Sequence, residues 1–140
     1  MAERNSQHEA DFEERLNGVA QSGCTALSVA IGSATGLFNT MAALGEAKTS
    51  KEIADAAGLK ERYVREWLGA MTVAKIVEAD FERDTFYLPP DRHRALCTTE
   101  SGGALAVLCE GIAWFSEVYK DIKECFKKDG PRGELFIKWT

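Results

Sequence analysis

The chain has 140 residues, of which 45% are hydrophobic and 28% charged, values typical of one soluble globular domain with a substantial core. Its formal net charge of −5 is unfavourable for a protein that must neutralise nucleic-acid phosphates. No apolar run approaches the roughly 18 residues of a membrane span. The polar, acidic first residues lack signal-peptide or transit-peptide character, so we expect a cytoplasmic protein.

The cysteines do not form a recognisable metal or disulfide motif. Successive cysteines are separated by 73, 12 and 16 positions, and no CxxC occurs. They are Cys24, Cys97, Cys109 and Cys125. The two histidines, His8 and His93, do not complete a ligand set, so we predict no metal site and reduced, mostly buried thiols.

The N-terminal third is predicted to be helical after a disordered start. Residues 1–10 are polar and uncapped, which favours disorder, and a short helix is expected over residues 11–21. Apolar residues then recur at helical spacing. The first group is Leu27, Ala30, Ile31 and Ala34, which predicts one buried helical face, and the second is Leu37, Phe38, Met41 and Leu44. Gly36 between the two groups is expected to interrupt or kink the helix. The small residues 32–34 would let another helix approach closely.

The segment from Thr49 to Leu88 has the order of a winged helix-turn-helix. Thr49 and Glu52 form a capping-box sequence, and Gly58 supplies the turn after that helix. The second helix has an apolar stripe of Val64, Trp67, Leu68 and Met71. Two alternating strands follow around residue 77 and residue 86, with residues 81–84 as the polar wing tip, and Pro89-Pro90 ends the sheet.

A long apolar helix is predicted after Thr98, with Thr99 or Ser101 as its cap. Its stripe has successive spacings of 3, 4, 3, 4, 3 and 4 residues, a heptad pattern over about three heptads. The stripe consists of Leu105, Leu108, Ile112, Phe115, Tyr119, Ile122 and Phe126, and Trp114 and Val118 widen it. Such a helix must pack on the N-terminal helices, on a second copy, or on both. The predicted fold class is therefore mainly α: a winged helix-turn-helix with extra N-terminal helices and a long C-terminal helix.

The charges around the motif argue against DNA binding. Winged-helix repressors place the second helix in the major groove. Here Arg62 and Arg65 share that helix with Glu61 and Glu66, and the wing tip carries two acidic residues and one arginine. Residues 46–94 contain nine Lys or Arg against ten Asp or Glu, so the module is not a basic patch.

The residues around GLKERYVREWLGAM and FYLPPDRHRAL carry a family resemblance. From about Leu27 to Leu96, the chain resembles the N-terminal winged-helix domain of a mycobacterial-type family of class I S-adenosylmethionine-dependent methyltransferases. Lys60 departs from this pattern, because an N-capping Ser or similar residue is expected there. An extra residue within residues 90–94 departs from it as well, so no role is carried over to His93.

The resemblance implies a domain that dimerises the protein and covers the substrate pocket, ahead of a Rossmann-like domain that binds S-adenosylmethionine through a glycine-rich loop. No glycine-rich strand-loop-helix occurs in the 140 residues, and residues 32–36 form a GxxxG helix feature instead. The chain is therefore expected to bind no cofactor and to be inactive alone. We divide it into residues 1–10, a domain over residues 11–128, and a linker or tail over residues 129–140 that leads toward the missing domain.

No catalytic or metal-binding residue is predicted. Trp67 is expected in the core, Tyr63 at the edge of the core with its hydroxyl bonded to backbone, and His93 at the surface. The candidates for dimer or substrate-lid contacts are Trp114, Phe115, Tyr119, Ile122 and Phe126. A homodimer or a methyltransferase domain is the expected partner. The alternatives are a freestanding winged-helix DNA-binding regulator, a protein-interaction module, and a fragment or splice form of a longer gene product.

Overall fold

The computed structural model describes residues 2–98 and 104–132, which are mainly helical with one small antiparallel sheet. In chain order, the elements are α1 (Ala2–Ala34), α2 (Leu37–Leu44), α3 (Ser50–Ala57), α4 (Glu61–Val73), β1 (Glu78–Asp80), β2 (Thr85–Tyr87), α5 (Pro90–Leu96), α6 (Ala104–Glu117) and α7 (Tyr119–Cys125). The mainly α fold class and the winged helix-turn-helix are thereby confirmed.

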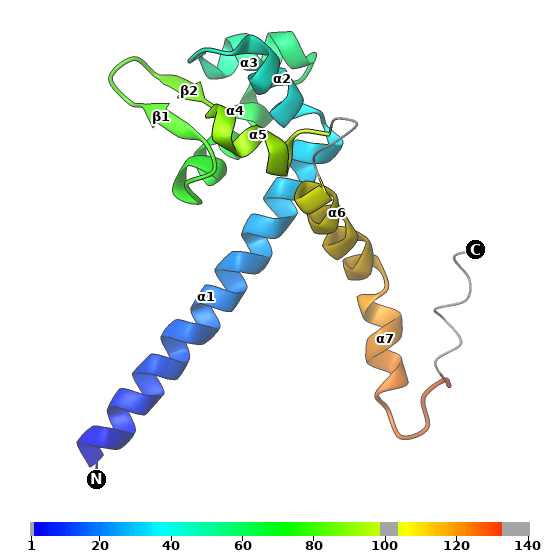
Figure 1. Ribbon diagram of the computed structural model, residues 1–140. Coiled ribbons are helices and arrows are strands. Elements are labelled where there is room, and N and C mark those ends of the chain that lie inside the picture. The colour runs from blue at the N-terminus through cyan, green and yellow to red at the C-terminus, as the bar shows by residue number, and fades with distance from the viewer. Residues whose placement is uncertain (1, 99–103, 133–140) are drawn as a thin grey trace.

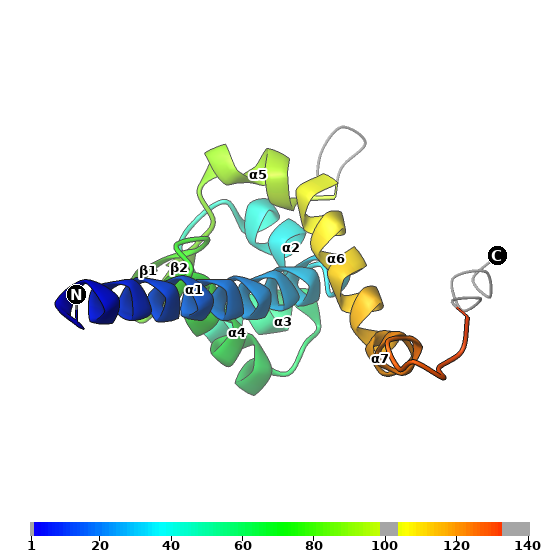
Figure 2. The same ribbon diagram turned by 90° about the horizontal axis from the view of Figure 1, so that it is seen from below.

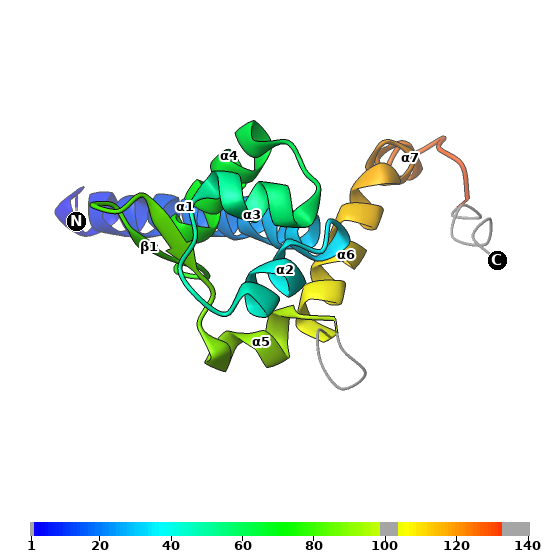
Figure 3. The same cartoon turned by 90° about the horizontal axis from the view of Figure 1, so that it is seen from above.

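The molecule consists of a head and two arms (Figure 1). The head contains α2 to α5, the β1–β2 hairpin and the C-terminal end of α1. We call residues 8–21 of α1 the N-terminal arm, and residues 104–128, which include α6 and α7, the C-terminal arm. Seen from above, α1 and α7 extend past the head in different directions (Figure 3).

Helix α1 is longer than the sequence predicts. The sequence predicts disorder over residues 1–10 and a separate short helix over residues 11–21, whereas one continuous helix begins at Ala2. The reason is that Ala, Glu, Arg and Gln have high helix propensity, and no proline interrupts the segment. Gly36, at φ 74°, ends the run and begins α2, and the two helices are bent by 67°. The predicted interruption at Gly36 is confirmed.

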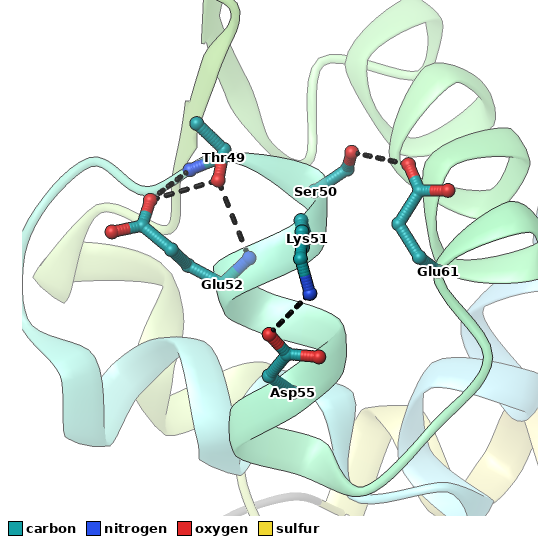
Figure 4. A network of polar contacts seen from close by, with 6 residues as sticks. All are labelled: Thr49, Ser50, Lys51, Glu52, Asp55 and Glu61. Atoms are coloured by element: carbon teal, nitrogen blue, oxygen red, sulfur yellow. Dashed lines mark hydrogen bonds and ion pairs between the residues drawn. The ribbon is translucent and has the colours of Figure 1, made fainter.

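The helix-turn-helix forms as its caps predict (Figure 4). The Thr49 hydroxyl accepts a hydrogen bond from the Glu52 amide, and the Glu52 carboxylate accepts from the Thr49 amide, which completes the capping box. Gly58 ends α3 in the left-handed conformation, at φ 68°. Lys60 begins α4 without a side-chain cap. A 2.8 Å hydrogen bond from the Ser50 hydroxyl to the Glu61 carboxylate joins the start of α3 to the start of α4.

The wing is a short hairpin in which Ala79 pairs with Phe86. Lys48 adds a bridge to Phe86, so the segment before α3 also contacts the wing. At the tip, Asp84 has a positive φ of 52°, and the Asp80 carboxylate accepts from the Glu82 amide at 3.0 Å. The positive φ of Asp84 and the hydrogen bond to the Asp80 side chain make the tip a tight turn.

The C-terminal part differs from the prediction in two ways. Pro90 does end the sheet, but it also begins a helix, α5, that was not predicted from the sequence; proline is favoured in the first turn because its fixed φ suits a helix start. The predicted single long helix is divided into α6 and α7 at Val118, where ψ is 1°. Just before the break, the Ser116 hydroxyl bonds to the Ile112 carbonyl, a contact associated with helix bending. The proposed caps Thr99 and Ser101 lie outside the described residues.

The core lies where α1, α2 and α4 meet. Trp67 is buried, as predicted, and its ring is 5.1 Å from that of Phe38 in an edge-to-face arrangement. Its indole N–H donates to the Ser28 carbonyl at 2.8 Å, so the buried polar atom is satisfied. A Cβ at Gly32 would lie 2.4 Å from Trp67 and 2.6 Å from Phe38. The close approach expected at the small residues therefore occurs, and it requires glycine.

Candidate interaction surface

The C-terminal arm presents an apolar stripe to solvent. One face of α6 is anchored in the head, because Ala106 is fully buried and Cys109 packs against the core. The opposite face carries the heptad residues Leu105, Leu108, Ile112, Phe115 and Tyr119, which are all exposed. Trp114 is 66% exposed and Phe126 is 85% exposed. Apolar area of this extent on a protein surface marks a contact surface.

A shallow groove of about 530 Å³ lies along this arm and is lined by Ile112, Phe115, Ser116, Tyr119 and Ile122. Three of the five candidate residues predicted from the sequence, Phe115, Tyr119 and Ile122, therefore come together. Trp114 and Phe126 are exposed on the same arm but do not line the groove. The groove has a mainly apolar wall, in which Ser116 and Tyr119 are the residues that carry a hydroxyl, and is suited to contact with another apolar surface.

The N-terminal arm has an apolar stripe that is absent from the candidates predicted from the sequence. Phe12, Leu16 and Val19 are 60%, 57% and 62% exposed, respectively. Their spacing of 4 and 3 residues is itself a heptad signal. Farther along α1, Leu27 and Ile31, predicted to be on a buried face, are 39% and 54% exposed. That prediction was wrong for these two residues, because the head covers α1 mainly over Val29 and Ala30.

The surface of the winged helix-turn-helix is polar, and more than half of its basic side chains are paired with carboxylates. Tyr63, predicted at the edge of the core, is 67% exposed, because the buried stripe of α4 begins one residue later at Val64. Five of the nine basic side chains in residues 46–94 are paired with carboxylates. The pairs are Lys48–Glu46 (2.7 Å), Lys51–Asp55 (2.8 Å), Arg65–Glu61 (3.5 Å), Arg83–Asp80 (3.7 Å) and Arg92–Glu78 (3.0 Å). These ion pairs reduce the positive potential available to a phosphate.

The perturbed titratable groups are structural. Hydrogen bonds from the Thr49 amide and then the Thr49 hydroxyl hold the pKa of Glu52 below its ordinary value. A hydrogen bond with Glu46 raises the pKa of Lys48. Burial raises the pKa of the Cys97 thiol, which keeps it protonated and unreactive. Each of these shifts has a local structural cause, so none identifies a catalytic group.

The burial of His93 and of the cysteines differs in part from the sequence predictions. His93 is half-buried rather than at the surface, with Nε2 3.1 Å from the Leu88 carbonyl oxygen, where it connects α5 to the end of β2. All four cysteines are free thiols; Cys97 is buried, whereas Cys24 is exposed. Within residues 2–98 and 104–132, no group of His, Cys, Asp or Glu side chains is arranged to hold a metal ion.

In the same part of the chain, no single helix is long and apolar enough to cross a membrane. Only α1 and α2 taken together have the necessary length and composition, and they are bent at the break between them.

These features define the class of protein. The α3–α4 helix-turn-helix followed by the β1–β2 hairpin is a winged-helix domain. A family model described as the Rv2258c-like winged HTH domain matches residues 23–99, more than half of the chain. The chain therefore belongs to the family of Rv2258c-like winged helix-turn-helix domains.

A solved structure, that of the mitomycin 7-O-methyltransferase MmcR, is similar to this chain with a TM-score of 0.66 and 17% sequence identity. The similarity covers 84% of this chain but 35% of the methyltransferase, so the chain spans about a third of that protein's length. At this level of identity, the similarity shows a shared fold. No curated protein sequence matches the chain significantly.

Proposed function

We propose that this chain is a non-catalytic winged-helix domain that dimerises, and helps to cover the substrate, in an S-adenosylmethionine-dependent methyltransferase. The observation that carries the proposal is the exposed apolar stripe of the C-terminal arm, with the groove along it. Its family membership and its fold similarity to part of an O-methyltransferase support the same function.

The chain's own residues do not fit the methyl donor. In dinucleotide-type folds, a parallel strand, a glycine-rich loop and a helix N-terminus together hold such a cofactor. The strands within the described residues are β1 and β2, three residues each and antiparallel. We therefore assign S-adenosylmethionine to a separate catalytic domain, with this chain as its non-catalytic partner.

Sedimentation equilibrium of the 140-residue chain tests the dimer. The expected mass is twice 15.4 kDa. A stable monomer at high micromolar concentration would contradict the dimerisation function. The coding sequence after Thr140 provides a second test: a glycine-rich strand-loop-helix there supports the methyltransferase assignment, and its absence there removes the main support for a methyltransferase fragment.

The alternative function is a freestanding winged-helix regulator that binds DNA or another protein. It is favoured by the exposed Arg62, Tyr63 and Arg65 on α4, the helix that such proteins place in the major groove. The net charge of −5 and the carboxylate pairing described above oppose it. Fluorescence anisotropy with a random duplex at low salt separates the two functions, because non-specific DNA binding is strongest there. Tight, salt-sensitive binding would favour the regulator, whereas unchanged anisotropy would exclude the DNA-binding form of this alternative.

A further inference from the structure

Most of the exposed large apolar side chains belong to the two arms. Of the sixteen large apolar residues that are exposed within the described part of the chain, thirteen lie on α1 or on the C-terminal arm. The other three are Tyr63, Val73 and Phe81, on α4 and at the wing tip. The head is thus well packed, and the surface left for a partner is concentrated on the arms.

The two arms of one chain do not cover each other. Both leave the head at the same place, where α6 packs against the C-terminal part of α1, and they then diverge (Figures 1 and 2). The N-terminal arm is a single helix that extends away from the head. An isolated helix of about this length is only marginally stable in water, and within the described residues nothing covers its exposed stripe, which is therefore available to a partner.

The ends of the two arms that are distant from the head carry opposite net charges. The N-terminal arm carries four acidic residues against Arg15, a net charge of −3. Residues 119–128, at the far end of the C-terminal arm, carry four lysines against two acidic residues, a net charge of +2. Each charged segment surrounds an apolar stripe, and each lies at the end of its arm distant from the head. Opposite charges around matching apolar stripes favour contact between unlike arms and disfavour contact between like arms.

We propose that the N-terminal arm of one copy packs against the groove of the C-terminal arm of a second copy, and reciprocally. This inference rests on the proposed dimerisation function and identifies the surface and the partner. A twofold axis parallel to the bisector of the two arms brings the N-terminal arm of each copy beside the C-terminal arm of the other. Both contacts between unlike arms then form in the same dimer, and the two heads lie at the same end of the axis. The paired helices then run antiparallel, with the acidic segment of each copy opposite the basic segment of the other.

The available area is sufficient for a stable interface. Side chains that are about half to two-thirds exposed each offer on the order of 100 Å². The two arms of one copy carry eleven exposed large apolar side chains, which together offer more than the roughly 800 Å² per partner that a standard interface buries.

Charge reversal on each arm tests the pairing. The first variant is Glu9→Lys/Glu13→Lys, which makes the N-terminal arm basic. The second is Lys120→Glu/Lys123→Glu, which makes the far end of the C-terminal arm acidic. Both sets of side chains are exposed, and neither contributes to the core. A matched control for the first variant, Glu66→Lys/Glu82→Lys, makes the same charge change on α4 and the wing. Sedimentation equilibrium gives the dimer dissociation constants, and far-UV circular dichroism monitors folding.

In a dimer of either arm variant, the N-terminal arm and the far end of the C-terminal arm that face each other carry charges of the same sign, at both contacts. The dimer dissociation constant is therefore expected to rise about tenfold at low salt. An equimolar mixture of the two arm variants has opposite charges at both contacts, so dimerisation is expected to return to the wild-type level. The effects should shrink in roughly 1 M salt, where charges are screened within about 3 Å. The control variant is expected to dimerise like the wild type.

If both arm variants dimerise like the wild type, or if their mixture does not recover, this pairing is wrong while the dimerisation function stands. If the wild type itself is a monomer at high concentration, the dimerisation function and this pairing are both wrong.

Discussion

At the scale of single residues, the core is tightly constrained by the absence of a side chain at Gly32. Its Cα faces the rings of Trp67 and Phe38, which are themselves in edge-to-face contact. The rings are fixed by the core on their other sides, and the Trp67 indole N–H is held by the Ser28 carbonyl. A methyl group at position 32 therefore has to displace two aromatic side chains.

We accordingly predict that Gly32→Ala lowers the free energy of unfolding by about 1–3 kcal/mol, the usual effect of overpacking. Urea unfolding followed by Trp fluorescence measures it. Gly18→Ala is the matched control: it lies in the same helix, with nothing within 4 Å of the added Cβ, and it is expected to stabilise the helix by up to about 1 kcal/mol. Equal effects of the two substitutions would show that the Gly32 contact is unimportant.

The capping box at Thr49 makes a second residue-level prediction. Thr49→Ala removes the hydroxyl that caps α3, which is expected to cost about 1 kcal/mol, while Thr49→Ser is expected to retain most of the stability. The pKa of Glu52 is lowered in the folded state, chiefly by hydrogen bonds from Thr49. Its contribution to stability is therefore present at neutral pH and is lost as the pH falls through the folded pKa.

Chemical unfolding at neutral and at acidic pH checks both statements. The difference between Thr49→Ala and the wild type should narrow under acid, because protonated Glu52 accepts hydrogen bonds more weakly than the carboxylate does. A difference that is the same at both pH values would contradict the assigned role of Glu52.

At the scale of elements, the C-terminal arm combines two faces with opposite roles. Ala106 and Cys109 fasten α6 to the head, whereas Phe115 and Tyr119 face solvent and line the groove. A substitution on the outer face should therefore affect association without unfolding the domain. This separation makes the arm a suitable place to test the proposed function.

We predict that Phe115→Glu or Tyr119→Glu raises the dimer dissociation constant by more than about tenfold, because each places a charge in an apolar contact. Sedimentation equilibrium measures the effect, and an unchanged helical signal in circular dichroism shows that the domain remains folded. Val73→Glu is the matched control, since Val73 is equally apolar and 85% exposed but lies on α4. If all three variants associate equally well, the C-terminal arm is not the contact surface.

At the scale of the whole molecule, the head is self-sufficient and the arms are not. The head contains the buried residues of α2, α3, α4 and the wing, whereas the N-terminal arm and the outer face of the C-terminal arm have no cover within the described residues. If a second copy provides that cover, the stability of the arms is coupled to association.

The apparent melting temperature should then rise with protein concentration, because mass action favours the state that binds. Differential scanning calorimetry over a hundredfold concentration range measures this dependence. The Phe115→Glu variant should show a melting temperature that is nearly independent of concentration. A wild-type melting temperature that does not depend on concentration would contradict coupling between folding and association.

The sequence by itself determined the local structure of the head. The Thr49 capping box, the Gly58 turn and the apolar stripe of α4 are short-range signals, each set by residues within one or two helical turns, and the structure agrees with each. The spacing of Phe115, Tyr119 and Ile122 likewise indicates that they share one apolar face. A helix over residues 11–21 was predicted, whereas its continuation back to Ala2 was missed, because the polar composition of residues 1–10 resembles that of a disordered segment.

Only the tertiary structure decided which apolar faces the chain covers itself. Helical spacing shows that a face is apolar but not which neighbour covers it, and for this reason Leu27 and Ile31 were predicted to be buried and are not. The exposure of Tyr63 and the break at Val118 also depend on how the helices pack. Burial is a property of the assembled helices, because removing apolar area from water requires a second surface at the right distance and direction.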